Sequence, residues 1–486
     1  MSLETQYSSG SFSRRIAELK SQSIVEIKFS GQDMGDVVAV YPKVSLSSCD
    51  TDSGRATFSG RLICTLIYLD GSGSLCRVQK GAEFSHFADD DRLAPMQQTV
   101  CRLSCDRSQV KRDGSSYVVS IVVGANIDVY ASADRNMLLS CEGAIVQTEN
   151  TKLYSAVKFS GESEVEDDFD CNAEDVLIPA AEVLVTDCNC RAGVIEITGE
   201  IYLSILAMRE GKPVSLERIV PFKSEIASEE SVLSRKAYCL AEIKDLSVTA
   251  QVNEEKGKCN VELIAALSFT GTYFEDEDFT IICDAFSPTC NVKLTSAEEQ
   301  VQVLNDYKVF SERVHGVCAI KAKIDFGCNF LAAILPRAEY TQSGNSLEGC
   351  VTATLLYEQG DEMRSTEISL PFTVPMPSGC GNTNIAVCGL NLRQRTEGEC
   401  DAEAVLKISA CEEETSTARY ITDLEEGEPK KVNDCALSVY IPCAGDSLWD
   451  TAKKLSQSPE TIQSTNPELS FPLTGDERIL VYRIKT

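Results

Sequence analysis

Histidine, the residue type used most often for general acid–base catalysis, is scarce in this chain of 486 residues, which contains only two. His86 lies between Ser85 and Phe87 in a segment typical of a strand, and His315 lies in a stretch of mixed charge. A Cys–His dyad, like most zinc sites, would depend on one of these two imidazoles. No G-x-S-x-G elbow, Walker-type phosphate loop or H-E-x-x-H helix occurs. We therefore expect no catalytic residue, no metal site, no cofactor and no enzymatic activity.

Carboxylates are abundant, since 74 residues are Asp or Glu. Acidic runs at 89–91, 164–170 and 275–278 contain the ligands that calcium prefers, but none has the EF-hand spacing. We interpret these runs as solvated loops between strands. Paired carboxylates could also serve a wall hydrolase as acid and nucleophile, although the sequence singles out no such pair.

The charge balance excludes several classes of function. The 45 Lys and Arg residues against 74 acidic ones give a net charge of −29. We expect no nucleic-acid partner, because phosphate backbones are bound by clustered cations. The polar start of the chain has no signal-peptide pattern, and no run of about 18 apolar residues occurs. The sequence therefore predicts a cytoplasmic protein without membrane insertion.

The chain contains 22 cysteines, which is unusual for a cytoplasmic protein. No C-x-x-C motif occurs, and Cys101/Cys105 and Cys188/Cys190 are the most closely spaced pairs, so the spacing predicts no metal site. Cys64 alternates with leucines, as a small buried side chain on a strand would. We interpret the cysteines as reduced structural thiols. The alternative is oxidative cross-linking in an assembly.

An apolar segment that begins with glycine occurs three times, and the same two residue types follow it at nearly the same spacing in each copy. A turn glycine follows 11 or 12 positions after the first glycine, and a phenylalanine follows 23 or 24 positions after it. The copies are Gly60, Gly71 and Phe84; Gly199, Gly211 and Phe222; and Gly349, Gly360 and Phe372. An upstream marker, Lys28–Gly31, recurs as Lys158–Gly161, with a weaker copy at Val309–Ser311. The shared order predicts a triplicated unit.

Antiparallel sheet is the structure that these units favour. Residues 195–205 alternate apolar and polar side chains, which predicts a strand with one buried face. Further strands are expected at Val118–Ile127, Val261–Phe269 and Ala402–Ile408. Ala297–Leu304 is the one segment here for which we predict a short connecting helix.

The C-terminal residues change from a period of two to helical spacing. Leu437–Ile441 predicts a strand, and Ser447 is a suitable N-cap for the helix that follows. Ser458-Pro459 predicts the start of a second helix, which Asn466-Pro467 would end. Arg478–Tyr482 returns to a strand. The predicted order is strand, helix, helix, strand around a very small core.

We thus predict a mainly β chain with three tandem antiparallel repeats, sandwich-like or barrel-like, followed by a small α+β (βααβ) module. The predicted boundaries are 1–21 for an N-terminal segment, 22–140, 150–296 and 303–414 for the repeats, 415–435 for a polar linker, and 436–486 for the module.

The C-terminal module closely resembles a LysM domain. The resemblance rests on Tyr440, Gly445–Trp449, Ala452–Lys454, Asn466-Pro467 and Gly475. It implies a structural core of Trp449, Ala452, Leu455, Ile462 and Asn466. In that family two loops flank a shallow groove, which takes N-acetyl groups of peptidoglycan or chitin where it binds glycans. The implied groove contacts are Asp446, Ser447 and Leu448 on one side, and Leu469, Ser470 and Phe471 on the other.

Tandem units with a terminal LysM domain resemble the SPOCS-domain family, the SipL-type spore-coat morphogenetic proteins of endospore-forming clostridia. The resemblance covers roughly 22–415 as repeats and 437–483 as the LysM domain. It implies a non-enzymatic adaptor, made in the mother cell, that assembles at the forespore surface. The implied partner of its LysM domain is the ATPase of the coat basement layer. The alternative is a peptidoglycan-binding protein of the cell wall or cortex.

Overall fold

The computed structural model describes residues 3–30, 34–228, 235–253, 258–320, 324–325, 327–360, 362–431 and 436–482. Antiparallel strands make up nearly all of these ranges, and helices occur in them only near the C-terminus. The prediction of a mainly β chain is therefore confirmed.

Three consecutive segments each contain six strands. The first comprises β1 (Glu4–Ser30), β2 (Val37–Asp52), β3 (Arg55–Leu69), β4 (Leu75–Asp89), β5 (Gln98–Asp113) and β6 (Ser116–Glu142). The second comprises β7 (Ile145–Cys171), β8 (Asp175–Arg191), β9 (Val194–Arg209), β10 (Lys212–Ala227), β11 (Arg235–Asn253) and β12 (Lys258–Phe286). The third comprises β13 (Cys290–Ala319), β14 (Asn329–Ser343), β15 (Ser346–Gln359), β16 (Glu362–Pro375), β17 (Cys380–Thr396) and β18 (Glu399–Pro429).

The strand order follows one pattern in each segment. The first and last strands pair along their length, and the fifth strand pairs with the last, as in β1-β6-β5 and β13-β18-β17. The second, third and fourth strands form a meander, as in β2-β3-β4 and β14-β15-β16. The second segment has the same neighbours, and pairing of β8 with β11 joins its two sheets into one of six strands.

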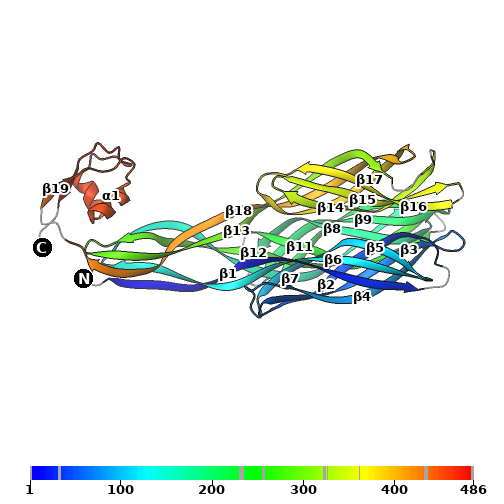
Figure 1. Ribbon diagram of the computed structural model, residues 1–486, viewed down its shortest axis with the longest axis horizontal. Coiled ribbons are helices and arrows are strands. Elements are labelled where there is room, and N and C mark those ends of the chain that lie inside the picture. Colours follow the sequence, from blue (N-terminus) through cyan, green and yellow to red (C-terminus); the bar gives the residue numbers. More distant parts are fainter. Residues whose placement is uncertain are drawn as a thin grey trace.

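The long first and last strands extend beyond the packed sheets. β13 has 30 residues, which at about 3.3 Å per residue corresponds to roughly 100 Å. Figure 1 shows the sheets gathered into a body at one end, while β1, β12, β13 and β18 continue as a narrow stalk toward the end where both termini lie. The molecule is therefore elongated, with a thick body and a thin stalk.

The body is held together where the three segments meet. One buried cluster contains Ile67, Leu206 and Leu356, which come from β3, β9 and β15. Each of these residues follows the leading glycine of its segment by seven positions. The three segments thus contribute the same position of their shared pattern to one apolar contact.

The Gly…Phe spacing has a direct structural reason. Gly60, Gly199 and Gly349 lie opposite Phe84, Phe222 and Phe372, respectively, on the neighbouring antiparallel strand. A Cβ atom on Gly199 would lie 2.4 Å from the Phe222 ring and 2.5 Å from the Leu184 carbonyl oxygen. The absence of a side chain on this glycine leaves room for the cross-strand ring.

Several local predictions were wrong. Residues 297–304, predicted as helix, lie within β13, and 415–429, predicted as linker, lie within β18. The acidic runs 164–170 and 275–278 are strand residues of β7 and β12 and not loops. The predicted N-terminal segment 1–21 is, from Glu4 onward, part of β1. In each case cross-strand pairing outweighs a local preference for helix or loop.

The strands expected at 118–127, 261–269 and 402–408 are present in β6, β12 and β18. The upstream marker, however, does not occupy corresponding positions. Phe29 is the penultimate residue of β1, whereas Phe159 lies 12 positions before the end of β7. Gly31 of the marker lies outside the described residues. The Gly…Phe spacing is therefore the better guide to the shared pattern.

Candidate functional site

The C-terminal residues form a small module in the predicted order. β19 (Leu437–Tyr440) pairs antiparallel with β20 (Ile479–Tyr482), and α1 (Leu448–Leu455) and α2 (Pro459–Thr465) lie between them in the chain. Ser447 caps α1 in a reciprocal capping box with Asp450, and Ser458 caps α2. Both helix starts thus follow from local sequence.

The core of the module contains four of the five predicted residues. Ala452, Leu455 and Ile462 are buried, and Asn466 is fully buried. The Asn466 amide donates to the carbonyl oxygens of Ile462 and Leu480 at 3.0 and 2.9 Å and accepts from the Leu480 amide at 2.7 Å. This asparagine therefore ties the end of α2 to β20 with no amide group left unsatisfied.

The residues on the first side of the predicted groove make hydrogen bonds within the module or pack against its core. Ser447 Oγ donates to Asp450 Oδ2 at 2.6 Å and accepts from the Asp450 amide at 3.1 Å. The Asp446 carboxylate accepts from Lys454 Nζ at 2.8 Å through both oxygens, and these hydrogen bonds lower the pKa of Asp446. Leu448 is half-buried against the core of the module. The polar groups of Asp446 and Ser447 are therefore used within the module, where they fix the shape of the loop.

The second side of the groove lies next to the first. The Leu473 amide donates to the Asp446 carbonyl oxygen at 2.9 Å, and the Gly445 amide donates to the Leu473 carbonyl oxygen at 2.7 Å. Leu469 and Phe471 are half-buried against the core, whereas Ser470 between them is exposed. The structure therefore brings the two predicted loops together, with Ser470 as the accessible side chain.

Trp449 occupies a place that the sequence does not predict. Its ring packs against Phe286 of β12, with centroids 5.2 Å apart and planes at 66°. Its Nε1 donates to Asp284 Oδ2 at 2.8 Å, and Lys453 Nζ contacts both oxygens of Asp284 at 2.7 Å. The tryptophan remains half-buried, and besides contacting the module's own core it fixes α1 to the stalk.

A second contact holds the module from the other end of α1. Lys430 Nζ donates to Ser456 Oγ and to the Ser287 carbonyl oxygen, each at 2.9 Å. Burial acts to raise the pKa of Asp284, but hydrogen bonds from Lys453 and Trp449 outweigh it and the pKa is lowered. The docked module therefore stabilises the charged form of Asp284. Sequence reasoning missed Asp284, Phe286 and Lys430 because nothing local to them indicates a partner.

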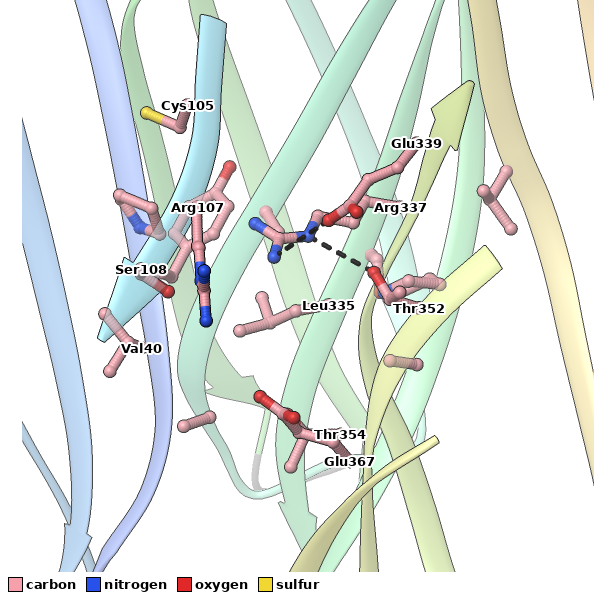
Figure 2. Close-up of a pocket in the computed structure, with 18 of the residues that line it drawn as sticks. Val40, Cys105, Arg107, Ser108, Leu335, Arg337, Glu339, Thr352, Thr354 and Glu367 are labelled. Carbon is pink, nitrogen blue, oxygen red and sulfur yellow. Dashed lines mark hydrogen bonds and ion pairs between the residues drawn. The ribbon is translucent and has the colours of Figure 1, made fainter. Parts of the chain in front are cut away.

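The body contains a cavity of about 1260 Å³ between the three segments. Figure 2 shows Arg107 and Arg337 reaching into it from opposite walls, with Glu339, Thr352 and Glu367 nearby. Arg337 Nε donates to Thr352 Oγ1 at 3.3 Å, and its Nη2 pairs with Glu339 at 3.3 Å. The cavity combines charges of both signs from distant parts of the chain, so no sequence motif could have indicated it.

Glu182 lines this cavity from β8. Burial raises the pKa of its carboxyl to about 7, although the Val387 amide donates to Glu182 Oε2 at 3.4 Å and Arg337 favours the charge. Tyr41 lies close by, accepts from the Ala181 amide at 3.4 Å, and has its pKa raised to about 12 by burial. The cavity wall thus holds an acid that titrates near neutral pH.

The two histidines, which were the other candidates for catalysis or metal binding, lie on different strands. His86 is half-buried between the rings of Phe58 and Phe87, at 5.9 and 5.3 Å, and His315 is exposed on β13. Among the residues that the structure describes, no group of three or more His, Cys, Asp or Glu side chains could hold a metal ion. In the same part of the chain, no helix is long and apolar enough to cross a membrane.

No family model, no curated protein and no solved structure matches the chain.

Proposed function

We propose that the protein is a non-enzymatic scaffold of the endospore coat, similar to the SPOCS-domain family. Three tandem β-sandwich-like repeats form its body, and a C-terminal LysM-like module docks a protein partner. The resemblance to that family makes the basement-layer ATPase of the coat the expected partner. The expected location is the cytoplasm of the mother cell and then the forespore surface.

The observation that carries the proposal is the position of the module. Trp449 and Lys453 hold it on Asp284 at the stalk end, while the three segments join at the opposite end of the molecule. Separation of a small module from a large body by a long stalk is a geometry suited to bridging two partners. The net charge of −29 further supports protein partners over nucleic acid.

A second candidate function is binding of peptidoglycan through the groove of the module. The adjacency of its two loops and the exposure of Ser470 favour this alternative. Under this alternative N-acetyl groups would contact the groove residues, and the body would act only as an anchor in the cell wall or cortex.

Binding assays on the full chain distinguish the two functions. The chain is incubated with purified peptidoglycan and sedimented, and separately with the coat ATPase of an endospore-forming host. Ser470→Arg places bulk and charge in the groove, whereas Gln463→Arg on the exposed surface of α2 is the matched control. Capture of the ATPase that only Ser470→Arg abolishes supports the scaffold. Sedimentation with peptidoglycan that Ser470→Arg abolishes supports the alternative, and failure of both contradicts the module's binding role.

A further inference from the structure

Eight cysteines lie in four pairs, and the two side chains of each pair belong to the same apolar cluster. The pairs are Cys49 with Cys101, Cys188 with Cys239, Cys171 with Cys259, and Cys318 with Cys400. All eight are free thiols. The spacing of cysteines in the sequence does not indicate these pairs, because the partners lie between 51 and 88 positions apart.

The first two pairs occupy corresponding positions in two segments. Cys49 lies on β2, 11 positions before Gly60, and Cys188 lies on β8, 11 positions before Gly199. Their partners, Cys101 and Cys239, lie on β5 and β11, the fifth strands of the two segments. Each pair therefore spans the boundary between the meander and the long-strand ladder.

The other two pairs also correspond to one another. Cys171 lies directly opposite Cys259 in the β7–β12 ladder, and Cys318 lies directly opposite Cys400 in the β13–β18 ladder. Both pairs lie at the body end of the long strands. Opposed residues of antiparallel strands have Cα atoms about 4.5–5.5 Å apart. This separation lies within the range of about 4.4–6.8 Å that a disulfide requires.

We propose that these four pairs are sites of intrachain disulfide formation by a peroxide-class oxidant. Each of the two kinds of pair occurs at corresponding positions in two segments, which argues against chance proximity. Six of the eight thiols are buried and the other two are half-buried, so a partner within the chain is closer than any other molecule. This inference concerns the body and stalk and is independent of what the module binds.

The reaction is a two-electron oxidation of each pair. The thiolate of one cysteine attacks hydrogen peroxide, which breaks the O–O bond and yields a sulfenic acid and, after protonation, water. The second thiol attacks the sulfenic sulfur and loses its proton, and the hydroxyl leaves as a second water. Two thiols and one peroxide thus give one disulfide and two waters.

Accessibility sets the expected order of reaction. Cys49 and Cys171 are half-buried, so one thiol in each of their pairs can meet the oxidant. Cys188 and Cys239 are both buried, as are Cys318 and Cys400. Hydrogen bonding from Cys101 lowers the pKa of Cys49, which favours the reactive thiolate. We expect Cys49–Cys101 and Cys171–Cys259 to form first.

Mass spectrometry of the full chain tests the proposal. The reduced protein is treated with hydrogen peroxide for increasing times, free thiols are blocked with N-ethylmaleimide, and unreduced tryptic peptides are sequenced. Linked peptides should join Cys49 to Cys101 and Cys171 to Cys259 early and the two buried pairs later. Oxidation should also raise the urea midpoint of the wild type.

Two variants keep the test independent of folding defects. Cys49→Ser should remove only its own linked peptide, and Cys443→Ser, which replaces an exposed cysteine, should leave all four links unchanged. Sulfinic or sulfonic acids at Cys49 and Cys171 without linked peptides would overturn the proposal. Links that join these cysteines to other chains would overturn it as well.

Discussion

The indole nitrogen of Trp449 donates a hydrogen bond to the carboxylate of Asp284, which lies 165 positions earlier in the chain. The same carboxylate accepts from Lys453, and the indole ring packs on Phe286. One acidic side chain on β12 therefore holds two neighbouring residues of α1. Because Trp449 is the only tryptophan of the protein, its fluorescence reports this contact without a label.

Asp284→Ala should loosen the module without unfolding it. Hydrogen bonds to charged groups contribute about 1.5–3 kcal/mol, so loss of this acceptor should shift the docking equilibrium at least about tenfold toward release. We expect a red shift of tryptophan emission and greater quenching by acrylamide, with unchanged far-UV circular dichroism.

Asp276→Asn is the matched control for this change, because Asp276 lies on the same strand and pairs with Lys152 at 2.8 Å. It should leave the emission spectrum unaltered. Equal spectra for wild type and Asp284→Ala would show that the Asp284 contact does not hold the module in solution.

Arg135→Met should strongly destabilise the stalk. Arg135 of β6 is paired with Glu299 of β13 and donates to the Tyr154 carbonyl oxygen of β7 at 3.1 Å, so one side chain links three segments. Only 5% of the Glu299 side chain is exposed, and an unpaired buried carboxylate costs about 3–5 kcal/mol. Urea unfolding should show a loss of this size.

The double variant Arg135→Met with Glu299→Met should recover most of that stability, because it removes the uncompensated charge. Lys293→Met tests an exposed pair, Lys293–Glu425, and should cost less than about 1 kcal/mol. If Arg135→Met were no more harmful than Lys293→Met, the pair would not join the segments as described.

Gly199→Ala should destabilise the second segment through overpacking. The added Cβ would meet both the Phe222 ring and a backbone oxygen at distances that require the strands to shift. A cost of about 1–3 kcal/mol is expected in the free energy of unfolding. Gly10→Ala, where nothing lies within 4 Å of the new atom, should change it by less than about 0.5 kcal/mol. Equal effects at the two glycines would contradict the proposed reason for the Gly…Phe spacing.

Glu182→Gln should increase stability at alkaline pH. The pKa of Glu182 is raised to about 7 in the folded chain, whereas the unfolded value is near 4.3, so folding favours the protonated form. The wild type therefore loses stability as the pH rises from about 4.3 to 7, by roughly 4 kcal/mol in total. The variant should lack this loss.

Urea unfolding at pH 5 and pH 8 measures the difference between the two chains. The difference in free energy of unfolding between Glu182→Gln and wild type should be larger at pH 8 than at pH 5. For the exposed control Glu225→Gln this difference should be the same at both pH values. A constant gap at both pH values would place the Glu182 carboxyl in water and not in the cavity wall.

The strands and caps that carry a local signal could be predicted from the sequence. The Gly…Phe spacing locates β3 and β4 and their counterparts, and at Gly60 and Gly199 the facing ring occupies the space that a side chain would take. Ser447 and Ser458 locate both helices. Residues 297–304 favour helix by composition, but their ladder with β18 overrides this preference, and no local pattern reveals such a partner.

The candidate site was predictable only within the module. Asn466 and the capping serines act through neighbours close in sequence. Asp284 meets Trp449 only because β12 is long enough to reach the module, and the cavity around Glu182 needs all three segments to be assembled. Both features depend on contacts between residues far apart in the chain, which spacing alone cannot encode.

Fluorescence imaging in sporulating cells of an endospore-forming host provides the decisive test of the scaffold function. A tagged full chain is compared with a chain that lacks residues 437–486. The proposal predicts that the full chain forms a ring around the forespore and that the shortened chain stays diffuse in the mother cell. A diffuse signal from the full chain, or a ring from the shortened one, would contradict it.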